Sequence, residues 1–333
     1  MRGWGVLSIA IFLFSTIEVV SKIVLRETIA AVGSFTSSDA LLLACVRFFI
    51  GGVFLIAAAL GSWRRAVREM SLGDWARLGL LGLVGVTACT SLFHLSLRTI
   101  TAAQGAVIFS ATPIFVAALA PVLLGESLTL RKTLGILVGF AGVFLLCRPG
   151  GDLDGATTFG AFLMAGASFF FALYTVLGKH IFNPSSQGAL IGTAFVLGSI
   201  PLMPVLLSND MHLHRLVSSN GSVLWSVMYL GLAATGAGYL LYFKGLHRIG
   251  ASKGATVFYL KPVFASLLAV LLLGETLSAS MIAGTAVILS GLFLVTGASE
   301  SPHESKSRYP VSPQSHRAHR ESNHENHERY ESI

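Results

Sequence analysis

Long apolar stretches separated by short polar segments recur along the first 297 of the 333 residues. Ten stretches can be marked, each about 17 to 23 residues long, enough for a helix to cross about 30 Å of hydrocarbon. The alternating pattern of a transmembrane β-barrel does not occur, so helices are favoured. The sequence therefore predicts an all-α integral membrane protein whose ten transmembrane helices begin near Trp4, Ala40, Trp75, Thr101, Thr133, Phe159, Gly188, Ser222, Ala251 and Met281.

Composition agrees with this pattern. Hydrophobic residues make up 53% of the chain and charged residues 12%, whereas a soluble domain carries roughly 25% charged residues. The three cysteines lie within apolar stretches and lack the paired spacing of a disulfide framework or a metal site. We therefore expect buried cysteines, no metal and no cofactor.

The distribution of cations predicts the orientation. Ten spans place both termini on one side, and a cytoplasmic N-terminus leaves about one cation or none in each outer loop. The inner loops then carry Arg64, Arg65, Arg68, Arg77, Arg131, Lys132, Lys179, Lys244, Arg248 and Lys253. We expect a multi-pass protein of the cell (inner) membrane with both termini cytoplasmic. The net charge of +7 is mostly this inner-surface bias, so no nucleic-acid partner is needed.

The segment 298–333 differs from the rest of the chain. It is polar and basic and holds five of the ten histidines, which follow no fixed ligand spacing. Such a composition is typical of a disordered tail, which we expect on the cytoplasmic side without a metal site.

One internal repeat organises the apolar region. The words "LLGESL" (residues 123–128) and "LLGETL" (272–277) lie 149 positions apart, and this offset aligns the third to fifth stretches with the eighth to tenth. Each unit would hold five helices, and an odd number forces the second copy to enter from the opposite face. The predicted units are two inverted repeats, 1–148 and 157–297.

These features identify a resemblance. The chain resembles the ten-helix drug/metabolite transporters with two EamA-type domains, on the strength of two Pro-centred helices that end in "LLGE", Pro113 to Glu126 and Pro262 to Glu275. The resemblance covers about residues 4–297. It implies a central cavity, alternating access and transport of small polar metabolites, often by export of amino acids or related compounds. Lys261 departs from the pattern of the family, in which this position is usually not basic.

Three charges are predicted to lie deep in the membrane: Glu18, Arg47 and Lys261. A charge there costs at least about 2.5 kcal/mol, which makes each a functional candidate. Glu18 and Arg47 have matching depths and could pair. None of the three has a charged counterpart in the other repeat, and their surplus positive charge would suit a carboxylate or phosphate on a substrate. The alternative is an internal salt-bridge network.

Other candidates carry weaker signals. Gln104, Thr112, Tyr174, Tyr239 and Tyr259 could line a cavity or could be ordinary packing residues. Pro113 and Pro262 interrupt two helices as hinges or as static kinks. Glu126 and Glu275 are expected to be structural, each favouring the N–H groups of the following helix, with Gly125 and Gly274 supplying the turns.

Glycines mark the close contacts between helices. The motif "GILVG" (135–139) with Gly142, together with Gly284 and Gly291, predicts tight packing of the fifth and tenth helices. These glycines could serve packing within one chain or a homodimer face, so a monomer and a homodimer both remain open.

Several functions compete. No P-loop is present, which disfavours ATP-driven pumping, and no GxSxG, HExxH or His/Asp cluster lies within the spans, which disfavours an enzyme. A sensor that signals through its tail has little support. The sequence therefore favours a secondary transporter, preferably an exporter, of amino-acid-like solutes or organic anions, with a flippase for lipid-linked sugars or phosphates as the main alternative.

Overall fold

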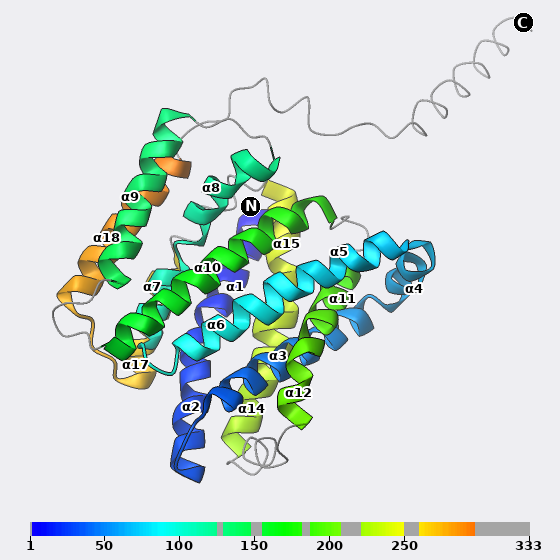
Figure 1. The fold of residues 1–333 in the computed structure, drawn as a ribbon, viewed down its shortest axis with the longest axis horizontal. Helices are drawn as coiled ribbons and strands as arrows, with labels where there is room; N and C mark the ends of the chain where they lie inside the picture. The colour runs from blue at the N-terminus through cyan, green and yellow to red at the C-terminus, as the bar shows by residue number, and fades with distance from the viewer. Residues whose placement is uncertain are drawn as a thin grey trace, which may run out of the picture. The chain divides into compact units, whose positions relative to one another are not determined.

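The computed structural model describes residues 2–124, 129–147, 155–181, 187–207, 221–249 and 260–296. Within these ranges all regular structure is helical, without a strand (Figure 1). The chain divides into a unit from Met1 to Gly297, which holds all the described residues, and a unit from Ala298 to Ile333. The predicted disordered tail therefore lies outside the described residues.

The helices are apolar enough to cross a membrane. Among the described residues, eight helical segments have the required length and hydropathy, and two apolar helices are shorter. The eight are Trp4–Val32, Ser37–Ala58, Leu72–Ser96, Ala102–Leu123, Leu130–Cys147, Gly155–Gly178, Gln187–Val205 and Gly221–Gly245, and the shorter two are Leu260–Leu273 and Ala279–Val295. This supports a multi-pass membrane protein, and the count of ten spans stays a prediction.

Several of these segments consist of more than one helix. The elements are α1 (Arg2–Ser15), α2 (Ile17–Val32), α3 (Ser37–Ala58), α4 (Leu60–Glu69), α5 (Leu72–Gly82), η1 (Leu83–Ala88), α6 (Cys89–Ser96), α7 (Ala102–Phe109), α8 (Thr112–Leu124), α9 (Leu130–Cys147), α10 (Gly155–Ile181), α11 (Gln187–Ser199), η2 (Ile200–Leu202), α12 (Met203–Leu207), α14 (Gly221–Tyr229), η3 (Leu230–Ala237), α15 (Gly238–Ile249), α17 (Leu260–Leu273) and α18 (Ala279–Thr296). Capping boxes, in which a side chain bonds the first N–H groups of a helix, begin α3, α5 and α7.

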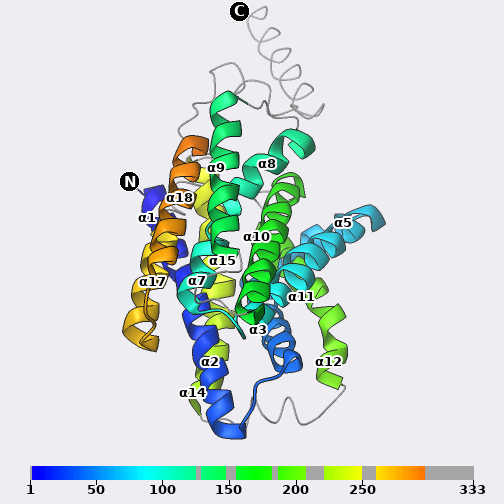
Figure 2. The ribbon, with the colours of Figure 1, turned by 60° about the vertical axis from the view of Figure 1, so that its left-hand side comes forward.

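The helices pack in pairs that follow the sequence repeat. The pairs with the broadest contacts are α9 with α18, α3 with α11, α1 with α15 and α10 with α6, and α7 packs on α17 (Figures 1 and 2). Shifting the bounds of α9 by 149 residues reproduces those of α18. The repeat seen in the sequence therefore extends to local structure.

Glycines bring α9 and α18 together. A Cβ atom added to Gly135 would lie 2.7 Å from the carbonyl oxygen of Gly291, and one added to Gly142 would lie 2.9 Å from the backbone nitrogen of Ile288. The glycine faces therefore meet within one chain, as small residues allow in a membrane. The sequence left two uses of these glycines open, packing within one chain and a homodimer face, and the contacts observed are those of packing within one chain. A homodimer through these helices would have to use their large exposed side chains, such as Leu137, Phe144, Ile282 and Phe293.

We expect Gly135→Ala to lower stability by about 1–3 kcal/mol, because the added methyl meets backbone atoms that cannot rotate away. Gly79→Ala is the matched control, since a Cβ atom at that position has no neighbour within 4 Å. Thermal unfolding of the purified variants in detergent measures the difference, and equal midpoints would contradict the packing described here.

Two π-helical segments occupy equivalent positions in the repeat. They are η1 and η3, and the 149-residue offset places residues 83–88 on 232–237. A π-segment disturbs the regular hydrogen-bond ladder and is frequent at functional sites. Thr235 lies within η3, Cys89 directly follows η1, and Tyr239 is the second residue after η3. The segments therefore position Cys89 and Tyr239, which line a buried cavity, and Thr235, which bonds Arg47 beside it.

The prolines lie near helix starts. α7 ends at Phe109 and α8 begins at Thr112, so Pro113 occupies the first turn of a new helix, where its missing N–H costs little. This corrects the expected position in the middle of one continuous helix. Pro262 is the third residue of α17, and residues 250–259 before that helix lie outside the description. The hinge role of both residues stays a prediction.

Candidate functional site

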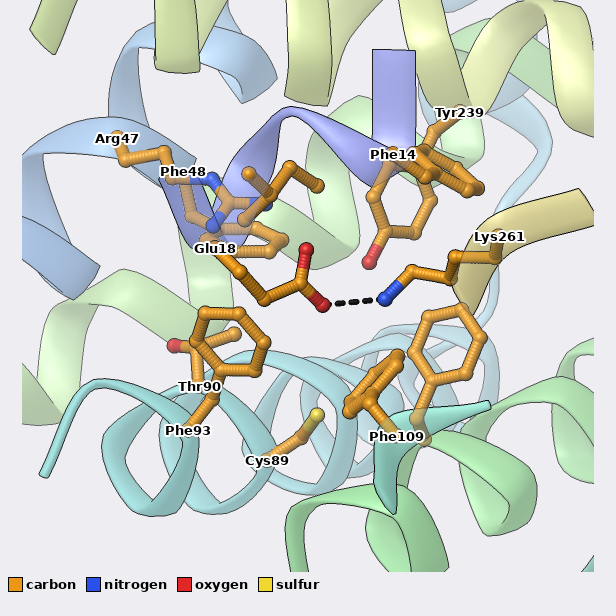
Figure 3. A pocket seen from close by; sticks show the side chains of 12 residues that line it. Phe14, Glu18, Arg47, Phe48, Cys89, Thr90, Phe93, Phe109, Tyr239 and Lys261 are labelled. Carbon is orange, nitrogen blue, oxygen red and sulfur yellow. Dashed lines mark hydrogen bonds and ion pairs between the residues drawn. The ribbon is translucent and has the colours of Figure 1, made fainter. Parts of the chain in front are cut away.

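A buried ion pair joins two helices from the two ends of the chain. Glu18 is the second residue of α2 and is fully buried, and Lys261 is the second residue of α17 and 2% exposed. The Lys261 ammonium donates a hydrogen bond to Oε1 of Glu18 (Figure 3). The pairing of Glu18 with Arg47 that the sequence left possible is therefore not formed. Matching depths on neighbouring helices suggested it, but α17 packs against α1 and α2 and brings a closer cation.

Arg47 is the second buried cation. It lies on α3, is 3% exposed, and its Nε donates to the Thr235 hydroxyl at 2.6 Å. The guanidinium carbon lies 4.9 Å from the ring centroid of Phe48. Among the described residues, the bond to Thr235 is the one hydrogen bond that Arg47 makes, so its terminal NH groups have no acceptor there. They are available to a ligand.

Glu18, Arg47 and Lys261 share one cavity with a volume of about 30 Å³. It has room for roughly one or two water molecules, whereas sites for organic ligands measure about 300–1,000 Å³. The described conformation is therefore too narrow around the charges to hold an organic ligand. Besides the three charged residues, the walls consist of Phe14, Ile17, Phe48, Cys89, Thr90, Phe93, Phe109, Phe171 and Tyr239 (Figure 3).

The charges in this cavity do not balance. Two cations face one anion, and one carboxylate oxygen, Oε2 of Glu18, is buried without a hydrogen-bond partner among the described residues. The Lys261 ammonium also lies 4.7 Å from the ring centroid of Phe109, close enough for a cation–π contact. The site therefore carries one surplus positive charge and suits one negatively charged group.

Aromatic rings form most of the wall. Tyr239 packs edge-on against Phe14 and Phe195, with ring centroids 5.0 and 4.9 Å away. Such contacts hold the ring in place. Tyr239 thus lines the cavity that the sequence suggested. Tyr174 lies behind it, at a centroid distance of 6.5 Å, and packs over Gly85.

Two further candidates have local roles instead of lining this cavity. The Gln104 side chain accepts a hydrogen bond from the Thr101 N–H and closes the capping box of α7. The Thr112 hydroxyl bonds the Phe109 carbonyl at 2.6 Å and lies 3.0 Å from the Ser168 hydroxyl. Short polar side chains near helix ends readily make such local bonds. Tyr259 lies outside the described residues.

Sequence reasoning missed Thr235, Cys89 and Thr90. All three are neutral. Thr235 lies within η3, in the word "LGLAATGA" (230–237), and Cys89 and Thr90 are the two residues after η1, which ends the equivalent word "LGLVGVTA" (81–88). The repetition of these two words at the 149-residue offset was the available signal. The wall phenylalanines gave none, because phenylalanine is common throughout the apolar stretches.

Glu275 joins the two halves of the chain. Its carboxylate accepts the N–H groups of Ala102 at 2.8 Å and Ala103 at 3.0 Å, at the start of α7. We expected Glu275 to interact with the N–H groups of the helix that follows it, and that prediction is wrong, because Glu275 caps α7 instead. The physical cause is the expected one, the attraction of a carboxylate to the N-terminus of a helix. Gly274 supplies the turn with φ 65°. Gly125 and Glu126 lie outside the described residues.

We expect Glu275→Ala to destabilise the protein by about 0.5–2 kcal/mol, the usual value of a helix cap. Glu275→Gln should lose less, because its amide oxygen can still accept one of the two N–H groups. Glu69→Ala, at an exposed position, is the control. Thermal unfolding in detergent ranks the variants, and a Glu275→Ala midpoint equal to that of Glu69→Ala would refute the cap.

Comparison with known proteins agrees with these features. The profile of the EamA-like transporter family matches residues 2–148 and 158–297. An uncharacterized transporter of Archaeoglobus fulgidus is 29% identical over 76% of this chain and 87% of its own. A chloroplastic WAT1-related protein of Arabidopsis thaliana is 27% identical over 88% of this chain and 69% of its own.

A solved crystal structure shares the fold. It aligns with 94% of this chain and 99% of its own, with a TM-score of 0.60 and 21% sequence identity. The family match extends over both sequence units and includes the elements that carry Glu18, Arg47 and Lys261. The chain is thus a multi-pass membrane protein that belongs to the EamA-like transporter family of the drug/metabolite transporter superfamily.

Proposed function

We propose that the chain is a secondary transporter of small organic anions, which bind to Arg47 and Lys261 through an oxyanion group such as a carboxylate, phosphate or sulfonate. The observation that carries this proposal is a buried guanidinium whose terminal NH groups have no acceptor among the described residues and which borders a small cavity. A guanidinium binds the planar or tetrahedral oxygens of such groups through paired hydrogen bonds.

A purely structural network explains these charges less well. Buried ions are normally paired and fully hydrogen-bonded, because each costs several kcal/mol to remove from water. Here Arg47 bonds one neutral hydroxyl, and Glu18 leaves one oxygen without a partner among the described residues. A bound monoanion would cancel the surplus charge. An amino acid could use the same groups, with its carboxylate on Arg47 and its ammonium near the free oxygen of Glu18.

Alternating access would open and close this cavity. A volume of about 30 Å³ admits no organic solute, so binding requires the surrounding helices to separate. We infer that residues 1–148 and 157–297 are the two inverted repeats whose relative motion does this. The support is the equivalence of α9 with α18 and of η1 with η3. Export is the direction favoured by the family resemblance.

Uptake into proteoliposomes tests the proposal. Vesicles containing the purified chain are offered radiolabelled glutamate, gluconate, benzenesulfonate and glycerol 3-phosphate. We expect saturable uptake of at least one of them, above that of protein-free vesicles, and its inhibition by an excess of the same unlabelled anion. Uptake of all four at the protein-free rate would contradict transport of organic anions.

A groove lies between α17 and α18. It measures about 290 Å³ and is lined mainly by apolar residues, including Pro262, Val263 and Ile282. This groove favours one alternative function, that of a flippase for lipids with anionic head groups. Pro262 adjoins Lys261 in the chain, so an acyl chain in the groove would lie near a buried cation. Fluorescent phosphatidylglycerol, quenched from outside by dithionite, tests this, and unchanged accessibility in vesicles with the chain would exclude it for this lipid.

The orientation remains a proposal that rests on the cation distribution. With both termini in the cytoplasm, a cysteine introduced at Asp152 should react with an impermeant thiol reagent added outside intact cells. The three native cysteines are buried and should contribute little background. Labelling restricted to inside-out vesicles would refute this orientation.

A further inference from the structure

We propose that Glu18 is a proton-binding site that couples transport to protons, because Glu18 and the transported anion compete for the Lys261 ammonium. One proton would then move in the same direction as each anion. This inference rests on the proposed function, and it adds the coupling ion, the residue that binds it and the sign of the coupling.

The geometry makes Lys261 the sole hydrogen-bonded counter-ion of Glu18 among the described residues. The Lys261 ammonium holds Oε1, whereas Oε2 is buried without a hydrogen-bond partner. The other titratable groups on the cavity wall are Arg47 from α3, Cys89 from α6 and Tyr239 from α15. On the elements packed against α2, Tyr229 of α14 bonds Thr16 instead, and Lys22 lies one turn further along α2 itself.

An anion that enters between Arg47 and Lys261 would draw the ammonium away from Glu18. Ionised Glu18 would then be buried without its partner, which costs several kcal/mol. Protonation removes that cost, since a neutral carboxyl group is much cheaper to bury. The anion therefore strengthens proton binding, and by reciprocity the proton strengthens anion binding by the same factor.

The sign of this coupling follows from the charges. Cooperative binding means that the proton and the anion cross together, whereas a cationic solute would compete with the proton and give exchange. The empty site carries two cations and one carboxylate. A bound monoanion and a bound proton add opposite charges, so the loaded and empty sites have the same net charge. Transport of a monoanion is therefore expected to be electroneutral.

The proton and the anion can be measured in the same vesicles. Proteoliposomes contain the pH dye pyranine, and potassium with valinomycin holds the membrane potential at zero. Radiolabelled glutamate, gluconate and benzenesulfonate are added outside, and benzenesulfonate is decisive because it does not carry a proton itself. We expect internal acidification by about one proton per anion and faster uptake with acid outside. In separate vesicles, where a potassium gradient with valinomycin imposes a membrane potential, the rate of uptake should not change.

Variants assign the proton to Glu18. In Glu18→Gln the ratio of protons to anions should fall to zero, and its uptake should no longer respond to a pH gradient. Glu18→Asp should restore the response, because it keeps the carboxyl group. If Glu18→Gln does not fold, the ratio in the wild-type protein still decides the coupling, and the residue is decided by Glu18→Asp: a changed pH dependence of its uptake supports Glu18, and an unchanged one contradicts the assignment.

The outcomes separate the two proposals. Anion uptake by the wild-type protein without protons would overturn the coupling and leave anion transport intact. Protons that still accompany the anion in Glu18→Gln would overturn the assignment to Glu18. Failure of the wild-type protein to transport any of the three probes would contradict the proposed function for these anions and the coupling with it.

Discussion

Lys261→Met is expected to destabilise the protein by about 3–5 kcal/mol, the usual cost of removing one partner of a buried ion pair. Glu18 is fully buried, and the Lys261 ammonium is its one hydrogen-bonded cation among the described residues. The Glu18 carboxylate would therefore lose its hydrogen-bonded partner, and Arg47, which faces the same cavity, makes no hydrogen bond to replace it. Thermal unfolding in detergent and the yield of folded protein in membranes measure the loss, and transport should disappear as well.

The double variant Glu18→Gln/Lys261→Met separates stability from function. It removes both charges and keeps similar side-chain volumes, so stability should return to near the wild-type value. Anion uptake should remain lost, because the Lys261 ammonium that binds the anion is missing. A single Lys261→Met variant as stable as the wild-type protein would contradict the pairing, and a double variant with normal uptake would contradict the role of Lys261 in binding.

Arg47→Ala is expected to abolish anion uptake while leaving folding largely intact. The variant loses one hydrogen bond to a neutral hydroxyl, at a cost of about 1.5–3 kcal/mol, but it also removes the surplus buried charge. Loss of a charged contact to the anion weakens binding by about 2–5 kcal/mol, or roughly 30- to 5,000-fold in affinity. Uptake kinetics and thermal unfolding of the same preparation measure the two effects.

Two controls define the contribution of Arg47. Arg47→Lys keeps the charge but loses the fork of NH donors, so we expect partial uptake with a raised KM. Thr235→Val removes the acceptor of Nε and leaves the cation in place, so it should reduce uptake less than Arg47→Ala. Arg47→Ala with normal kinetics would remove this residue from the binding site.

The sequence predicted the class of fold because length and apolarity determine which segments can span a membrane. The repeat was visible because sequence words recur at a 149-residue offset, and the same shift matches the bounds of α9 and α18 and two of their glycines, Gly135 with Gly284 and Gly142 with Gly291. An interruption at Pro113 was predicted, but in the middle of a helix and not in the first turn of a new one. The boundary at Thr16 and the π-segments were not predicted, because they change a few backbone hydrogen bonds without altering hydrophobic periodicity.

The charged residues of the candidate site were predicted from the sequence, but the contacts between them were not. Glu18, Arg47 and Lys261 stood out because a charge in an apolar stretch is costly, and one cavity unites them. Which cation meets Glu18 depends on how α17 packs on α2, and depth along a helix cannot reveal this. Likewise, the reach of Glu275 to α7 is a contact between residues 172 positions apart, beyond what a local helix-capping pattern can indicate.

The structure of the protein with a transported anion tests the central claim most directly. The anion found in the uptake screen would be added before structure determination in a lipid nanodisc. We expect its negative group between the guanidinium of Arg47 and the ammonium of Lys261, with Glu18 separated from Lys261 and the cavity enlarged beyond its present 30 Å³. An anion bound elsewhere, with Lys261 still on Glu18 and the cavity closed, would contradict it.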